Sequence, residues 1–113
     1  MKVIIDNYTY EAELAPNATA ETFARFLPLE LEMSDLNNNE KYFYTAARIP
    51  RTEYLPGHID CGDIMLWEAD CIVVFYKSFD NPFPYSRIGR ILDADKLPEL
   101  LAGRKSVRIK FEI

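Results

Sequence analysis

Glycine, cysteine and histidine are scarce in this 113-residue chain, and it has no long apolar run. Four glycines leave no phosphate-binding glycine loop, dinucleotide fingerprint or G-x-S-x-G nucleophile turn. One histidine and two cysteines show no ligand spacing, so no metal site and no cofactor are expected. No apolar stretch approaches the roughly 20 residues of a membrane span, and the first residues lack a signal-peptide core. We therefore expect a cytoplasmic protein.

The charge balance is mildly acidic, with a net charge of −5 at pH 7 and thirteen scattered basic residues. A nucleic-acid binder needs clustered Lys and Arg to neutralise phosphates, so this class is excluded. Hydrophobic residues make up 49% and charged residues 27%, which is typical of a folded globular chain. At this length we expect a single domain over residues 1–113, with no room for a second core.

Alternation of apolar and polar residues marks the clearest strands. Residues 106–113 and 29–34 each place apolar side chains at every second position, with charged or polar residues between them. A period of two indicates a strand with one buried face and one wet face. We also predict strands at Glu40–Tyr44 and Tyr85–Leu92.

The N-terminal strands are predicted to form a hairpin. Asp6-Asn7 separates two β-rich runs, and both residue types tolerate the positive φ of a tight turn. The resulting register places Val3 opposite Tyr10, and Lys2 opposite Glu11.

A second hairpin, over residues 64–76, is apolar on both faces. A two-residue turn at Ala69-Asp70 would place Cys71 opposite Glu68. The predicted faces are Ile64, Leu66, Val73 and Phe75 on one side, and Met65, Trp67, Ile72 and Val74 on the other. A strand pair buried on both sides needs a cover on each, which a barrel interior and a helix can supply.

Two segments have helical spacing. Residues 18–27 have Asn17 as a candidate N-cap and Pro28 as a stop, and their apolar stripe is Phe23, Phe26 and Leu27. Residues 95–102 have Asp95 and Gly103 as candidate ends, and their stripe is Leu97, Leu100 and Leu101. The whole pattern predicts a mostly-β fold, a closed barrel of about eight strands with two helices.

The cysteines and the histidine have simple interpretations. Cys61 is expected opposite Ser78, too far from Cys71 for a disulfide, so both thiols are predicted to be free. His58 follows a turn-rich stretch. It is either a solvated loop histidine or the base of a nucleophile pair, although nothing local arranges such a pair.

Three features leave alternatives open. The three asparagines at 37–39 form either a turn or the polar rim of a binding site. The proline-containing segment 75–85 keeps its rings in a loop, where they either plug a barrel end or form an apolar patch that binds a ligand. Arg87, predicted to share a face with Tyr85, Gly89 and Ile91, either forms an exterior salt bridge or reaches a ligand carbonyl.

Four ordered blocks resemble the small bacterial cyclophilin-like proteins. The blocks are residues 34–42 (SDLNNNEKY), 62–67 (GDIMLW), 75–79 (FYKSF) and 85–91 (YSRIGRI). The proteins they resemble are largely uncharacterised domains that are sometimes linked to flavodoxin-like domains. The resemblance covers nearly the whole chain, and it implies an eight-stranded barrel with two helices covering its ends.

The resemblance to cyclophilin prolyl isomerases is more distant. Residues 74–76 and 88–91 are similar to two of their strands. Those enzymes also carry a Phe-His-Arg strand and a Gly-Ser-Gln-Phe-Phe block, where this chain has residues 41–44 (KYFY) and 70–75 (DCIVVF). Isomerase activity implied by this resemblance would need Arg87 to replace the missing arginine and polarise the prolyl amide.

The leading functional hypothesis is a binding module for a short peptide segment or a small ligand. Its groove is predicted from aromatic walls and two polar anchors: Phe75, Phe79, Phe83 and Tyr85, with Lys77 and Arg87. The first alternative is a weak peptidyl-prolyl isomerase that uses Arg87 as its catalytic residue. The second is an interaction partner of a flavodoxin-like redox protein, which rests on the resemblance alone.

Overall fold

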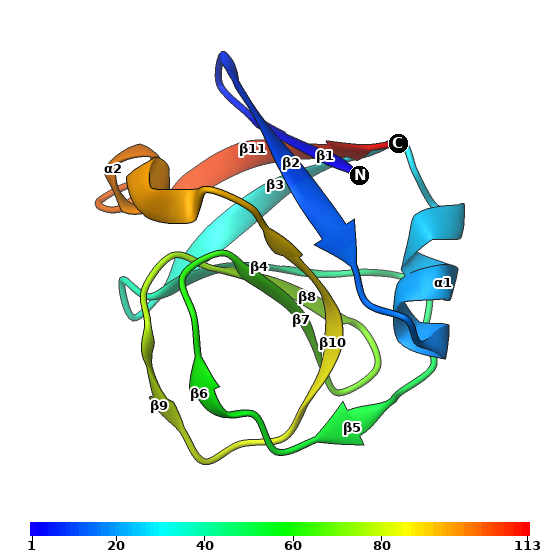
Figure 1. Ribbon diagram of the computed structural model, residues 1–113. Coiled ribbons are helices and arrows are strands. Elements are labelled where there is room, and N and C mark those ends of the chain that lie inside the picture. The colour runs from blue at the N-terminus through cyan, green and yellow to red at the C-terminus, as the bar shows by residue number, and fades with distance from the viewer.

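Eight antiparallel strands close into a barrel in the computed structural model, which describes all 113 residues (Figure 1). The order around the barrel is β2 (Tyr8–Leu14), β1 (Lys2–Ile5), β11 (Ser106–Glu112), β3 (Leu29–Leu36), β4 (Glu40–Tyr44), β8 (Cys71–Phe75), β7 (Asp63–Trp67) and β10 (Tyr85–Ile91). Strand β10 pairs with β2 and closes the ring. The predicted mostly-β class and eight-stranded closed barrel are confirmed.

The N-terminal hairpin has the predicted register. Val3 lies opposite Tyr10 and Lys2 opposite Glu11, with Asp6 at a φ of 53° in the turn. A side chain with a short polar group tolerates this left-handed conformation, so the Asp6-Asn7 pair was enough to predict the turn from the sequence.

The β7–β8 hairpin differs from its prediction by one residue. Its turn contains Glu68, Ala69 and Asp70, so Cys71 lies opposite Trp67 instead of Glu68. Side chains alternate along a strand, so this slip moves every β8 side chain to the other face. The barrel interior therefore receives Ile64, Leu66, Ile72 and Val74, whereas Met65, Trp67, Cys71, Val73 and Phe75 face outward.

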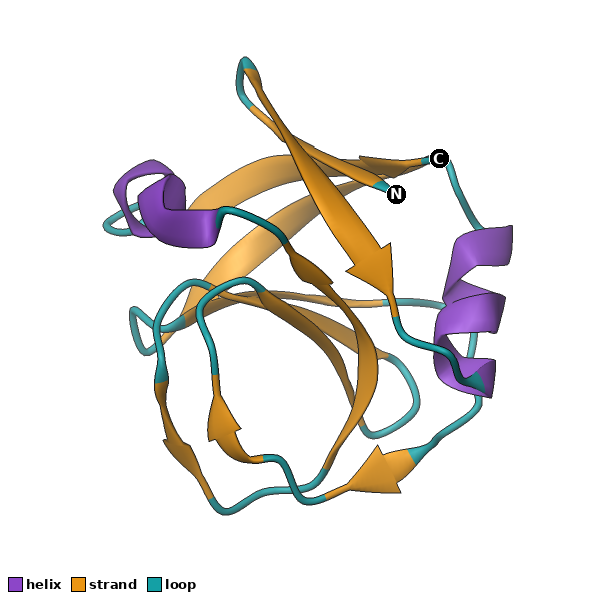
Figure 2. Cartoon of the chain, in the orientation of Figure 1, coloured by secondary structure: helices purple, strands orange, loops and turns teal.

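Two short helices cover the barrel, as predicted (Figure 2). Helix α1 (Ala18–Arg25) begins at Asn17, whose side chain accepts a hydrogen bond from the Ala20 amide at 2.8 Å. Its Phe23 is buried in the barrel core, but Phe26 lies beyond the helix and is exposed, so the predicted stripe is only partly correct.

Helix α2 (Leu97–Leu101) follows a single 3₁₀ turn at Ala94–Lys96. Asp95 lies inside that turn and caps neither element, so the predicted cap is wrong. Leu97 and Leu101 are buried in the core. None of the helices has the length and apolar character needed to cross a membrane.

The outer face of β7 and β8 is covered by a strand ribbon, and the predicted helical cover is wrong for this face. The ribbon pairs β6 (Gly57–Ile59) with β9 (Phe79–Asn81) and lies apart from the main sheet (Figure 1). Ile59 of β6 and Phe79 of β9 pack on Met65, Val73 and Phe75. The protein thus has a second apolar cluster outside the barrel core.

Candidate functional site

A pocket of about 500 Å³ opens on the outer face of the barrel. Its floor comes from alternate residues of β4 and β8 and from Trp67 of β7. Its wall comes from β9, the loop before β10 and Tyr85 at the start of β10. The lining residues are Leu36, Asn37, Asn39, Glu40, Tyr42, Tyr44, Trp67, Cys71, Val73, Phe79, Asn81, Phe83 and Tyr85. The volume is typical of a small-molecule site, and most of the lining is apolar or aromatic.

The aromatic rings of the pocket pack in edge-to-face or tilted pairs. The rings of Tyr42 and Tyr44 have centroids 5.9 Å apart and planes at 77°. Trp67 lies 6.1 Å from Phe83 with planes at 84°, and 5.3 Å from Tyr85. This packing is favoured by the ring quadrupoles, and it keeps the rings from covering one another face to face.

The asparagine segment is both a turn and part of the pocket rim. Asn37 and Asn38 have φ values of 54° and 56°, as the turn interpretation requires. The side-chain oxygen of Asn38 accepts hydrogen bonds from Tyr76 at 3.0 Å and from the Gly103 amide at 3.4 Å. Asn37 and Asn39 line the pocket. The two interpretations left open by the sequence are therefore compatible, because Asn37 belongs both to the turn and to the lining of the pocket.

Glu40 is the single acidic residue that lines the pocket. It is 8% exposed, and its carboxylate takes part in no hydrogen bond or ion pair of the fold but keeps access to the pocket. Lys41 points to the other side of strand β4, where its ammonium binds Asp35. Burial, with a smaller contribution from the charge of Asp35, raises the pKa of Glu40 to about 7.

Glu40→Gln is expected to stabilise the protein above neutral pH. Since the folded-state pKa lies above the unfolded value of 4.5, the folded chain binds more protons between these values, and wild-type stability falls as the pH rises from 4.5 to about 7. The amide carries no charge. Urea unfolding should therefore show no difference between the two proteins below about pH 4, and a gain of about 2 kcal/mol for the variant above about pH 8. A difference that does not change with pH would contradict the raised pKa.

The other ionisable side chains deep in the pocket are neutral near pH 7. Burial raises the pKa of Cys71 to about 11 and that of Tyr85 to about 12, and in both cases the Glu40 charge adds to the effect. Cys71 is therefore a thiol and not a thiolate nucleophile. Both cysteines are free, as predicted.

Three of the six ligand-binding residues predicted from the sequence line this pocket. Phe79, Phe83 and Tyr85 contribute to its wall. Phe75 is fully buried behind them, with its ring centroid 5.7 Å from that of Phe79 and 5.6 Å from that of Tyr85. It supports the wall without reaching the pocket.

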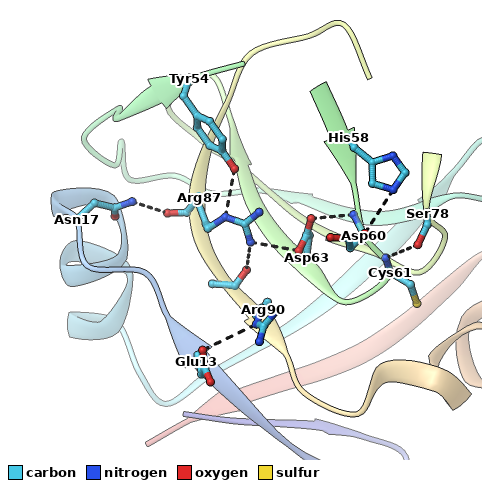
Figure 3. Close-up of polar contacts among 11 residues, drawn as sticks. Glu13, Asn17, Tyr54, His58, Asp60, Cys61, Asp63, Ser78, Arg87 and Arg90 are labelled. Carbon is cyan, nitrogen blue, oxygen red and sulfur yellow. Dashed lines mark hydrogen bonds and ion pairs between the residues drawn. The ribbon is translucent and has the colours of Figure 1, made fainter. Parts of the chain in front are cut away.

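The two predicted polar anchors lie elsewhere. The Arg87 guanidinium lies between Asp63 and Tyr54 of β5 (Glu53–Tyr54), with its nitrogens 3.1 Å from the Asp63 carboxylate and 3.1 Å from the Tyr54 hydroxyl (Figure 3). Burial opposes its charge, but the Asp63 carboxylate outweighs this effect, and the pKa of Arg87 is raised. Lys77 is exposed beyond β8, beside a polar depression that includes Cys61 and Ser78.

Strand β10 contains a bulge that interrupts the face predicted for Tyr85, Arg87, Gly89 and Ile91. Arg87 pairs with Met65 and Gly89 with Ile64, so Ile88 is the extra residue. Ile88 and Ile91 therefore both point into the barrel core, and Ile91 does not share the Arg87 face. A bulge inserts one extra residue and reverses the alternation beyond it, so a face predicted from a strict period of two is wrong after the bulge.

His58 lies on β6 and not in a loop. One ring nitrogen is 2.9 Å from Asp80 and the other is 3.4 Å from Asp60. The hydrogen bond to Asp80 is the main cause of its raised pKa. The Cys61 amide donates to the Ser78 hydroxyl at 2.9 Å (Figure 3). These two residues are therefore in contact, but both lie outside the paired strands β7 and β8, so they do not form the predicted cross-strand pair. No serine or cysteine is bonded to the histidine.

Several pocket residues were not predicted as site residues. The principal ones are Glu40, Tyr42 and Tyr44, which occupy every second position of β4. This strand was predicted with its observed bounds, and its alternation places one acid and two tyrosines on one face. That pattern could have identified the face, but not the ribbon that turns it into a pocket.

A closed eight-stranded antiparallel barrel with two short helices defines a cyclophilin-like β-barrel protein. The chain belongs to the Cyclophilin-like family, whose model matches residues 3–112. It is also similar to the solution structure of a hypothetical protein from Archaeoglobus fulgidus, with a TM-score of 0.62 and 20% sequence identity over 98% of this chain and 91% of that one. At this identity the likeness concerns the fold. None of the curated proteins compared with the sequence matches it.

Proposed function

We propose that this protein is a binding module whose site is the aromatic pocket on the outer face of the barrel. The ligand is a small molecule or a side-chain-sized part of a short peptide. The observation that carries this proposal is the open, aromatic-walled pocket of about 500 Å³. Such a pocket supplies a large apolar contact area, and a few polar groups at its rim fix the orientation of a ligand.

Exposed apolar side chains at the pocket support this function. Leu36, Tyr44 and Phe83 are 45%, 59% and 54% exposed, and all three line the pocket. Apolar surface that gathers around a concave site is typical of binding surfaces, whereas scattered exposed residues carry no such meaning. Within residues 75–85, the ring of Phe75 is a buried support, whereas the ring of Phe83 is accessible at the wall of the pocket.

Prolyl isomerase activity through Arg87 is an alternative that stays a prediction from the resemblance. The guanidinium would have to exchange Asp63, a carboxylate 3% exposed, for a peptide carbonyl. Removing one partner of a buried ion pair leaves the other without compensation, which is costly. A flavodoxin-like partner likewise stays a prediction.

The exchange of Phe83 for alanine is expected to separate binding from folding. Because its side chain is half exposed, Phe83→Ala should lower the free energy of unfolding by less than about 1 kcal/mol, whereas Phe75→Ala should lower it by about 3–5 kcal/mol. Chemical denaturation measures both changes. If the two variants are equally destabilised, the ring of Phe83 is a core plug and not a wall of a binding site.

The ligand can be sought with a library of small fragments. Trp67 is the sole tryptophan and lines the pocket, so its fluorescence reports occupation directly, and amide NMR shifts of residues 36–44 provide a second readout. Fragments that bind there should bind more weakly to Phe83→Ala. A library without any fragment that perturbs these signals would contradict the proposed function.

A further inference from the structure

The carboxylate of Glu40 is unusual because it has no partner in the fold. The residue is largely buried, but no fully buried side-chain oxygen of this protein lacks a hydrogen bond, so the carboxylate reaches the space of the pocket. Of the charged residues that the fold buries, Lys41 binds Asp35 and Asp63 binds Arg87. Glu40 has neither an ion pair nor a hydrogen-bonded side chain, although it is more than nine-tenths buried. Burying an isolated carboxylate is costly, so a fold with no use for it would be more stable with a neutral residue at this position.

The charges around Glu40 do not compensate for it. Asp35 is a like charge. The ionisable groups whose pKa the Glu40 charge raises are Tyr85, Cys71 and Tyr76, and all three are neutral near pH 7. The Lys41 ammonium is held on the other side of β4 by Asp35 and by the Arg104 carbonyl. No Lys, Arg or His lines the pocket. A ligand could therefore supply the positive charge that the protein does not.

The walls of the pocket favour the same kind of ligand. Six aromatic rings line it, those of Tyr42, Tyr44, Trp67, Phe79, Phe83 and Tyr85. The face of an aromatic ring carries partial negative charge and attracts ammonium groups, most strongly in the case of tryptophan. An anion would meet Glu40 and these ring faces with no basic residue to bind it, so anionic ligands are disfavoured.

We infer that the ligand of the aromatic pocket is an organic cation, an amine or methylated ammonium group that pairs with the Glu40 carboxylate among the surrounding rings. This inference rests on the proposed function and specifies its ligand class. Asn37 and Asn39 at the rim provide amide groups for a polar substituent of the ligand. Glu40 is the specificity-determining residue, because it alone in the lining distinguishes a cation from a neutral molecule of the same shape.

Three probes of nearly equal shape test the inference: choline, the neutral 3,3-dimethylbutan-1-ol and the anionic 3,3-dimethylbutanoate. Binding is followed by Trp67 fluorescence and amide NMR shifts. Above about pH 8, choline is expected to bind at least about tenfold more tightly than the neutral alcohol, and the anion more weakly than either. In the wild-type protein, choline affinity should rise with pH through about 7, as Glu40 ionises, while that of the alcohol should not.

Two variants complete the experiment. Glu40→Gln should weaken choline binding about tenfold and leave the alcohol unchanged, whereas Glu11→Gln, which removes an exposed acid on β2, should change neither. If Glu40→Gln fails to fold, the dependence of wild-type choline affinity on pH still tests whether the Glu40 charge binds the ligand. Equal binding of choline and the alcohol, or choline binding that is insensitive to both pH and Glu40→Gln, would overturn the inference while leaving the binding module intact. If neither these probes nor the fragment library perturbs the pocket, both proposals fail.

Discussion

Gly89→Ala is expected to cost at least about 4 kcal/mol, enough to unfold a domain of ordinary stability. A Cβ atom at this position would lie 2.1 Å from the Glu13 carbonyl oxygen and 3.3 Å from the Leu14 Cα. Both atoms belong to the backbone of β2, which cannot move away without giving up its pairing with β10. That pairing closes the barrel, and no other strand can replace β2 beside this part of β10. The clash would therefore open the barrel.

Gly103→Ala is the matched control. Gly103 has a φ of 75°, and a Cβ atom there meets nothing within 4 Å, so alanine should cost only the strain of a left-handed conformation, about 1–2 kcal/mol. Urea unfolding and the dispersion of amide NMR signals measure the two effects. Equal stability of Gly89→Ala and Gly103→Ala would mean that β10 and β2 are not in contact at Gly89.

Asp35→Asn is expected to lower the free energy of unfolding by about 3 kcal/mol, because it leaves the fully buried Lys41 ammonium without its counter-charge. The ammonium lies 2.9 Å from the Asp35 carboxylate, which also accepts a hydrogen bond from Tyr76 at 2.6 Å. The Arg104 carbonyl, which also accepts from Lys41, carries no charge that could replace the carboxylate.

The stability difference between wild type and Asp35→Asn should depend on pH, because the pKa of Asp35 is lowered in the folded protein. Burial alone would raise the pKa of Asp35, but the hydrogen bonds from Tyr76 and Lys41 outweigh it, and the pKa lies below its ordinary value of 3.8. The stabilisation is therefore complete above that value and is lost as the pH falls through the lower folded-state pKa. The difference between Asp35→Asn and wild type should accordingly shrink in acid.

A second substitution separates the buried charge from the shape of the site. Lys41→Met in the Asp35→Asn background removes the uncompensated ammonium and should recover part of the lost stability. A double variant that is less stable than Asp35→Asn would indicate that the lysine side chain contributes through packing on Tyr76, whose ring centroid lies 5.4 Å from the ammonium.

Local signals in the sequence were sufficient to predict those elements whose structure depends only on residues close to each other in the chain. The Asp6-Asn7 turn fixed the first hairpin, Asn17 capped α1, and the alternation of residues 40–44 predicted β4 with its observed bounds. In each case the signal and its effect lie within a few residues of each other. The predicted aromatic segment also contributes to the pocket wall through Phe79, Phe83 and Tyr85.

Tertiary structure alone decided which faces these strands present. The extra turn residue between Trp67 and Cys71 and the bulge at Ile88 each change which side chains point outward, and a prediction from strict alternation assumes that neither is present. The pocket itself depends on β9 folding back with β6 over the outside of the barrel, a contact between residues far apart in the sequence. The sequence thus determined the class of fold and the rings available to it. The pairing of β4 with β8 and of β6 with β9 placed Glu40 among those rings, and the pairing of β10 with β7 gave Arg87 a structural partner in Asp63. Both outcomes depend on long-range pairing that no local pattern records.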